Sequence, residues 1–219
     1  MAENLGELPK RTSSDVAHTL TKAGLNLIPV VGGTVAELFG LVIAPQLEKR
    51  RDKWLEELAA SINQLQEREK GFKIEELGKS EVFVSAVLQA SQIALRTHEA
   101  EKLEALRNAL LHIAITKPLK EDFQIFYLNL IDTFTVTHIE ILRVFDKPDA
   151  HPQRRVELSN RRIITDPFVM DLNNRGLIKD SRPLAARGRE SDTALVSYEW
   201  SLSDLGRGFL AFISKPYDA

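Results

Sequence analysis

Cysteine is absent from this sequence. The chain therefore has no disulfide bond, no thiolate metal site and no cysteine nucleophile, which suits a reducing compartment. Motifs that carry chemistry are also missing: Gly32 and Gly33 are not followed by the Gly-Lys-Ser/Thr of a phosphate-binding loop, and no G-x-S-x-G nucleophile elbow occurs. We therefore expect a protein that is not an enzyme and holds no cofactor.

The few histidines stand in no metal-binding spacing such as H-E-x-x-H. They are His18, His98, His112, His138 and His151. On a helix His98 and Glu101 would share one face, which is the ordinary arrangement of an exposed pair. The sequence predicts no metal site.

An excess of one charge is lacking too, because 29 Lys and Arg face 31 Asp and Glu, a net charge of −2. This balance gives no global reason to expect nucleic acid. The first twenty residues lack the basic-then-apolar order of a secretory signal. We expect a cytoplasmic protein, peripheral at the inner face of the membrane if it meets a membrane at all.

Residues 25–44 form an apolar run in which Glu37 is the only ionisable side chain. Aliphatic side chains contribute roughly −3 to −6 kcal/mol to bilayer insertion, and Glu37 with the breaks offsets most of that gain. Two interpretations stay open: a buried helical hairpin, or a membrane-inserting segment whose Glu37 faces a helix interface. The breaks in the run are Pro29, Gly32, Gly33 and Gly40.

An amphipathic helix is predicted from Gln46 onward, and Pro45 either ends the apolar run or stands in the first turn of this helix. Its apolar stripe consists of Leu47, Trp54, Leu58, Ile62 and Leu65. A basic cluster at its start consists of Lys49, Arg50, Arg51 and Lys53. This cluster is typical either of a juxtamembrane basic flank or of a solvated helix face.

Residues 81–115 contain no Gly or Pro and predict one long helix, or two nearly collinear ones, capped by Ser80. Small residues in its first half favour close packing, with residues 25–44 as a candidate partner. Its second half carries an amphipathic stripe, and Glu121 and Asp122 open a further helix. The buried face expected for that further helix consists of Phe123, Phe126, Tyr127, Leu130 and Ile131.

The last third predicts a helix capped by Thr135 and a second helix opened by Thr165 or Asp166 with Pro167 and ended by Gly176. A hairpin and a closing helix over residues 201–213 follow. Residues 135–213 resemble a winged-helix module. The most specific match is Leu202, Ser203 and Gly206 in the "L-T-x-x-G" pattern that follows the wing. The expected fold is mainly α: a flexible tail (1–13), a helical bundle with a long central helix (14–134) and a small α+β winged-helix-like domain (135–219).

In a winged helix, residues 166–175 would be the recognition helix. This helix contains two aspartates, Asp166 and Asp171, and one arginine, Arg175. Its net negative charge disfavours contacts with DNA phosphates. We therefore favour protein contact over DNA binding for this module. The arginines that would contact a nucleic acid or a partner are Arg154, Arg155, Arg161, Arg162, Arg182, Arg187 and Arg189.

Three runs, IPVVGGTVAELFGLVIAPQLEKRRDKWLEELA, FVSAVLQASQIALRTHEAEKLEALRNALL and FYLNLIDTFTVTHIEILRVF, are similar to an uncharacterised bacterial family of helical proteins. The apolar run followed by Arg50 and Arg51 also resembles abortive-infection alpha proteins of antiphage defence. Both resemblances imply a helical protein with no catalytic motif. The expected function is protein-protein contact, including self-association, in defence or stress response. The alternatives are a membrane-acting effector using residues 25–44 and a DNA-binding winged-helix regulator.

Overall fold

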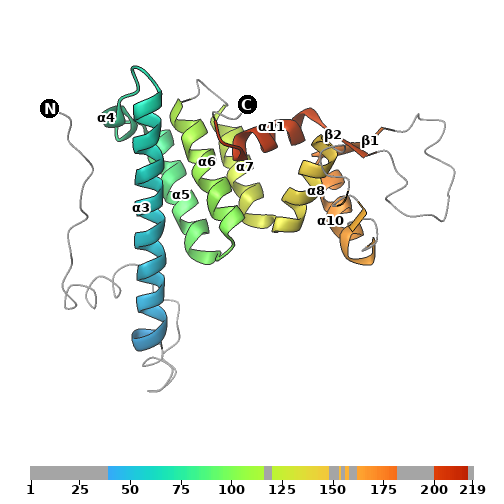
Figure 1. Ribbon diagram of the computed structural model, residues 1–219, viewed down its shortest axis with the longest axis horizontal. Coiled ribbons are helices and arrows are strands. Elements are labelled where there is room, and N and C mark those ends of the chain that lie inside the picture. The colour runs from blue at the N-terminus through green and yellow to red at the C-terminus, as the bar shows by residue number, and fades with distance from the viewer. Residues whose placement is uncertain are drawn as a thin grey trace. The chain divides into compact units, whose positions relative to one another are not determined.

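Helix α6 (Ala100–Ile115) is the central element of the computed structural model. It contacts α5 (Glu81–Arg96), α7 (Glu121–Thr133) and α11 (Asp204–Ile213), and α5, α6 and α7 run side by side (Figure 1). Buried side chains lie on several faces of α6, as is usual for a helix with neighbours on more than one side. They belong to Lys102, Ala105, Leu106, Asn108, Ala109, Leu110 and Leu111. The amphipathic stripe expected here is confirmed in part: Leu106 and Leu110 are buried and Glu104 is exposed as predicted, whereas Lys102, predicted on the polar side, is buried.

The structure describes residues 39–115, 120–147, 153, 156–157, 162–181 and 200–216. The chain divides into two units, residues 1–60 and residues 61–219, and the boundary falls within α3 (Ala44–Arg68). Our expectations for the tail and for residues 14–38 lie outside the described residues.

Helix α3 confirms the amphipathic helix, and Pro45 stands in its first turn as expected. A π-helical turn, η2 (Phe39–Ile43), precedes it. Four residues of the predicted stripe are buried: Trp54, Leu58, Ile62 and Leu65. Leu47 is 44% exposed, so the buried stripe begins later than the sequence pattern indicated.

The long helix expected over residues 81–115 is wrong, because α5 ends at Arg96 and α6 begins at Ala100. The two helices pack against each other as a hairpin, so they are not collinear either. Thr97 has extended backbone angles, and its Oγ1 accepts a hydrogen bond from the Glu99 N–H (3.2 Å). A local side-chain bond of this kind competes with helical hydrogen bonding and ends the helix without Gly or Pro. The cap of α5 is confirmed, since the Ser80 side chain accepts from the Phe83 N–H.

A short helix, α4 (Ile74–Leu77), follows α3 and precedes α5 in the sequence.

Helix α7 begins at Glu121 and buries Tyr127, Leu130 and Ile131 as expected. Phe123 and Phe126 are exposed, which contradicts the predicted buried face. Gln124, in the same turns, is buried, so the start of α7 is covered on another side than the two phenylalanines.

The C-terminal elements are α8 (Val136–Asp146), α10 (Arg162–Asn174), β1 (Ile178–Asp180), β2 (Trp200–Leu202) and α11. Strands β1 and β2 pair antiparallel, with Ile178 opposite Leu202, and Gly176 has a φ of +75° after α10. Helix α10 starts before the expected Asp166, and Pro167 lies inside it. Proline removes one backbone donor there, yet the helix continues on both sides. The closing helix starts at Asp204, because residues 201 and 202 belong to β2.

The Leu-Ser-x-x-Gly stretch joins the strand pair to α11. The Ser203 side chain caps α11 by accepting from the Gly206 N–H (3.0 Å), and its hydroxyl donates to the Gly176 carbonyl (2.6 Å). A Cβ on Gly206 would collide with the Leu177 carbonyl oxygen. Glycine is therefore required at this close approach of two backbones.

Three side chains of the bundle hold α11 in place. Tyr127 donates from its hydroxyl to the Leu205 carbonyl (3.2 Å), and Asn108 donates from Nδ2 to the Ile213 carbonyl (2.9 Å). Nε2 of His112 lies 3.0 Å from the Ser214 carbonyl oxygen. Helix α11 thus contacts both α6 and α8 within one unit, and the described protein is mainly helical with a small two-stranded sheet.

Replacing Asn108 with Ala should destabilise the protein by about 1–3 kcal/mol, because the buried Ile213 carbonyl loses its donor. Urea denaturation followed by circular dichroism measures this change. The matched control is Asn174→Ala at an exposed position, where we expect a change within about 0.5 kcal/mol. Equal effects of the two substitutions would contradict a role for the Asn108 amide.

Candidate functional site

The apolar run named by the sequence lies mostly outside the described residues, including Pro29, Gly32, Gly33 and Glu37. Its described end is solvent-exposed. Gly40 has no neighbour within 4 Å of the position a Cβ would take. The exposed apolar side chains there are Leu41 (74%), Val42 (51%) and Ile43 (37%). The core interpretation therefore does not extend to these residues.

The basic cluster Lys49, Arg50, Arg51 and Lys53 is exposed on α3. Arg51 pairs with Asp52 (3.2 Å) and Lys53 with Glu57 (3.7 Å), both on the same helix. Exposed pairs of this kind contribute little to stability. The described residues 40–53 thus carry exposed apolar side chains followed by exposed cations, and none of them is buried.

The arginines considered for nucleic-acid contact lie outside the part of the chain that the structure describes, apart from the backbone of Arg162 in α10. They are Arg154, Arg155, Arg161, Arg182, Arg187 and Arg189. Of the acidic residues weighed against them, Asp171 accepts two hydrogen bonds from Nε of Arg175, at 3.0 and 2.9 Å. Its charge is therefore compensated locally.

A polar cluster centres on the buried side chain of His138, to which sequence analysis assigned no role. The Thr135 N–H donates to Nδ1 of His138 (3.1 Å), so this histidine completes the capping box of α8. Nδ1 is then an acceptor, and the neutral ring carries its proton on Nε2, which lies 3.4 Å from Asp171 Oδ2. The sequence pattern that indicates this capping box is Thr135 followed three residues later by a side chain that can accept a hydrogen bond, His138.

The ring of His138 is also enclosed by aromatic groups. It stacks on Phe134 with centroids 4.6 Å apart and meets Phe168 edge-on at 4.8 Å. The guanidinium of Arg175 covers the Phe134 ring at 5.4 Å. Burial lowers the pKa of His138, and the Asp171 carboxylate opposes part of that decrease. The neutral imidazole is therefore the form that the fold prefers.

Large apolar side chains are exposed on both α5 and α7. Hydrogen bonds join Gln89 to Asn129 (2.8 Å) and Arg96 to Asp132 (2.9 Å), which shows that the two helices run parallel. Their first turns therefore lie at the same end of the bundle. The apolar side chains exposed on these helices are Val84, Leu88, Phe123, Ile125 and Phe126. We call these five residues the α5–α7 surface.

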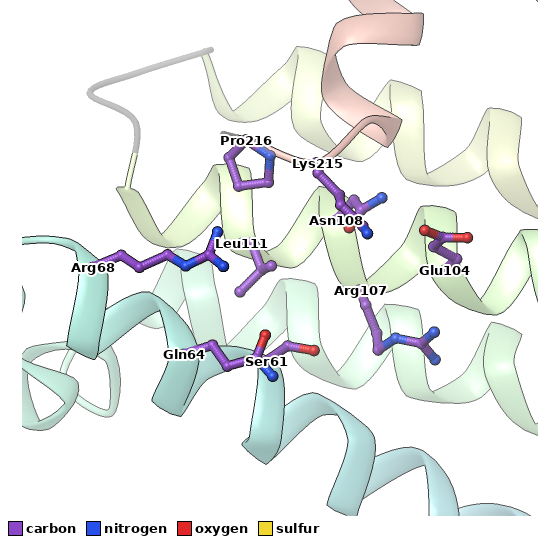
Figure 2. Close-up of a pocket in the computed structure, with 9 residues that line it drawn as sticks. All are labelled: Ser61, Gln64, Arg68, Glu104, Arg107, Asn108, Leu111, Lys215 and Pro216. Atoms are coloured by element: carbon purple, nitrogen blue, oxygen red, sulfur yellow. The ribbon is translucent and has the colours of Figure 1, made fainter. Parts of the chain in front are cut away.

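A pocket of about 280 Å³ lies between the last turns of α3, helix α6 and the segment after α11 (Figure 2). Cationic side chains come from all three segments: Arg68, Arg107 and Lys215. Glu104 is its one carboxylate, and Gln64 and Asn108 add amides. This pocket could not be predicted from the sequence, because its lining residues come from three segments that are far apart in the chain.

Among the described residues, no group of three or more His, Asp or Glu side chains is placed to hold a metal ion. No single helix in the described ranges has the length and apolarity needed to cross a membrane. The sharply bent pair α7 and α8 meets that test jointly, by length and composition alone.

None of the protein-family models, curated proteins or solved structures compared with this chain matches it. The resemblances described from the sequence therefore stay predictions.

We expect stability to fall on acidification, partly through His138. Because burial lowers its pKa in the folded state, the unfolded chain binds more protons below about pH 6.5. The stabilisation is present above the unfolded pKa and is lost as the pH falls toward the folded one. His138→Gln keeps a capping-box acceptor, so it should flatten the decline in unfolding free energy between about pH 7 and pH 5. Denaturation at each pH measures this slope, and His98→Gln, at an exposed histidine, should keep the parent slope.

Proposed function

We propose that this chain is a non-enzymatic helical protein that acts through protein contacts, with the α5–α7 surface as its contact surface. The observation that carries this proposal is the exposure of large apolar side chains on two adjacent helices, with Leu88 61% exposed. Soluble proteins rarely leave such groups of apolar residues in water unless another molecule covers them.

The partner we propose is an amphipathic helix with basic residues beside its apolar stripe. Acidic residues stand in the first turns of both helices, Glu81 on α5 and Glu121 and Asp122 on α7. Since the helices are parallel, these carboxylates lie at one end of the α5–α7 surface. Complementary charge would orient a basic helix laid along the apolar groups.

We also propose that residues 135–213 form a winged-helix-like module used for protein contact. The order α8, α10, β1, β2 and α11 supports this proposal, as does the Ser203 cap that links the strand pair to the last helix. The resemblance to abortive-infection alpha proteins supports a role in bacterial antiphage defence or stress response, in the cytoplasm.

The contact proposal is tested with two synthetic helical peptides that share one leucine stripe and carry either Lys or Glu on the flanks. The parent protein should bind the Lys peptide at least about tenfold more tightly than the Glu peptide, measured by fluorescence anisotropy, because opposite charge favours only the first.

The double variant Leu88→Lys, Ile125→Lys should lose binding of the Lys peptide, while Gln66→Lys, at an exposed position on α3, should retain it. Equal affinity for both peptides, or full binding by the double variant, would contradict the proposal. Sedimentation velocity of the parent and the double variant shows separately whether a second copy of the chain is the partner.

A second candidate, membrane association, is favoured by one observation on the first unit. Exposed Leu41, Val42, Ile43 and Leu47 are followed by four exposed cations on α3. Apolar side chains beside a basic cluster are typical of segments that lie in the interface of an anionic membrane.

If this candidate holds, the full-length protein should float with vesicles rich in anionic lipid. Arg50→Glu with Arg51→Glu should weaken partitioning by tenfold or more, because each basic residue near the surface contributes about 1 kcal/mol. The matched control is Lys73→Glu with Lys79→Glu, exposed lysines outside the cluster. Flotation of the Arg50, Arg51 variant equal to that of the parent would exclude the basic cluster as the membrane contact.

A further inference from the structure

We propose that the helix bound at the α5–α7 surface is the start of α3 from a second copy of this chain. Residues 41–53, which we call the α3 segment, are the part that makes the contact. This inference rests on the proposed function, because it names the occupant of the same contact surface. Three features of the described residues support it: an apolar stripe with an uncovered end, unpaired cations beside that end, and carboxylates beside the α5–α7 surface.

The apolar stripe of α3 continues beyond its buried part. Leu47 lies seven residues before Trp54, and Ile43 lies four residues before Leu47, so the three side chains share one face of the helix. Trp54 is only 3% exposed, whereas Leu47 is 44% exposed and Ile43 37%. The α3 segment is therefore the uncovered end of a stripe that is buried further along the helix. Exposed groups of apolar side chains of this kind mark sites where another molecule binds.

Two cations beside this uncovered end form no ion pair within the described residues. They are Lys49 and Arg50, and both are exposed. Arg50 follows Leu47 by three residues and so lies on the same face of the helix. The other two cations of the basic cluster are paired within α3. The α3 segment thus combines an apolar stripe with unpaired positive charge, which is the chemistry proposed for the partner helix.

The α5–α7 surface supplies complementary apolar groups. Leu88 directly precedes Gln89, and Ile125 lies one turn before Asn129. The hydrogen bond between the Gln89 and Asn129 side chains (2.8 Å) therefore brings these two exposed apolar positions near each other across the two helices. An apolar helix stripe laid along α5 and α7 would cover both.

The charges of the two elements are also complementary. Residues 79–81 and 120–122, at the start of α5 and α7, contain three carboxylates and two lysines, a net charge of −1 (three minus two). Residues 48–53 of α3 contain four cations and two carboxylates, a net charge of +2 (four minus two). Attraction between them would orient the α3 segment on the surface. The three carboxylates, all exposed, are Glu81, Glu121 and Asp122.

Every copy of the chain carries both elements, so each copy can give one α3 segment and receive another. A contact between two different surfaces either closes as a symmetric dimer with two exchanged helices or continues into larger assemblies. In both cases the protein associates with itself as its concentration rises.

The test is a pair of charge-reversal variants of the full-length protein, followed by sedimentation velocity over a range of concentrations at constant ionic strength. The segment variant carries Lys49→Glu and Arg50→Glu, and the surface variant carries Glu81→Lys and Asp122→Lys. We expect the parent to self-associate. Each variant alone should associate at least about tenfold more weakly, because like charges then face each other.

An equimolar mixture of the two variants should associate again. The acidic segment of one variant then faces the basic surface of the other, and the two unaltered elements also match. A variant that had merely lost its fold could not be rescued in this way, and circular dichroism verifies folding. The matched control for the segment variant is Lys70→Glu with Lys147→Glu, which changes the net charge equally at exposed positions and should associate like the parent.

A parent that stays monomeric at every concentration would overturn this inference, as would a mixture of the two variants that stays dissociated. A monomeric parent that floats with anionic vesicles would also overturn it and would assign the α3 segment to the membrane candidate. The segment variant has an intact α5–α7 surface and should still bind the Lys peptide. Binding of that peptide by a parent that does not self-associate would overturn the second-copy assignment and leave the proposed function standing.

Discussion

The end of α11 is the constraint on which the second unit depends. A helix leaves its last carbonyl groups without partners, and a buried carbonyl without a donor costs about 1–3 kcal/mol. Asn108 and His112, one turn apart on α6, supply donors to Ile213 and Ser214. Because α11 follows the strand pair and also contacts α8, this junction, together with the Tyr127 bond to Leu205, ties the C-terminal elements to the bundle. It also fixes where Lys215 emerges, and hence one wall of the pocket.

Other buried polar side chains in this unit also form hydrogen bonds with backbone groups at helix ends. Lys102 donates from Nζ to the Asp132 carbonyl at the end of α7 (2.9 Å), and His138 accepts from the Thr135 N–H at the start of α8. Burial lowers the pKa of Lys102, while Glu99 and Asp132 oppose that decrease. Lys102 thus supplies a partner to the end of a neighbouring helix, and His138 supplies one to the start of its own. Their burial therefore reflects the packing of helix ends and does not indicate catalysis.

Local sequence patterns predicted local structure well. They failed where contacts between residues distant in the sequence determine the end of a helix or the burial of a side chain. Apolar periodicity and the cap at Ser80 predicted α3 and the start of α5, since these features act within one or two turns. The same reasoning missed the break after Arg96, because a Thr97 hydroxyl and the packing of α5 on α6 end the helix without Gly or Pro. The same reasoning wrongly predicted that Phe123 is buried, because periodicity identifies apolar positions but does not show which of them the neighbouring helices cover. The pocket could not be predicted at all, since α3, α6 and the C-terminal segment meet only in the folded chain.

Helix α6 is held by several neighbours at once, since it contacts α5, α7 and α11. Binding at one surface of the bundle can change affinity at another only if the helix between them has two arrangements with different affinities for the bound molecule. Leu106, Ala109 and Leu110 of α6 are fully enclosed, and close-packed interiors resist small displacements. The physical expectation is therefore that a partner bound at the α5–α7 surface leaves the arrangement of α6 unchanged, and that its affinity is set by the charges and apolar area of that surface.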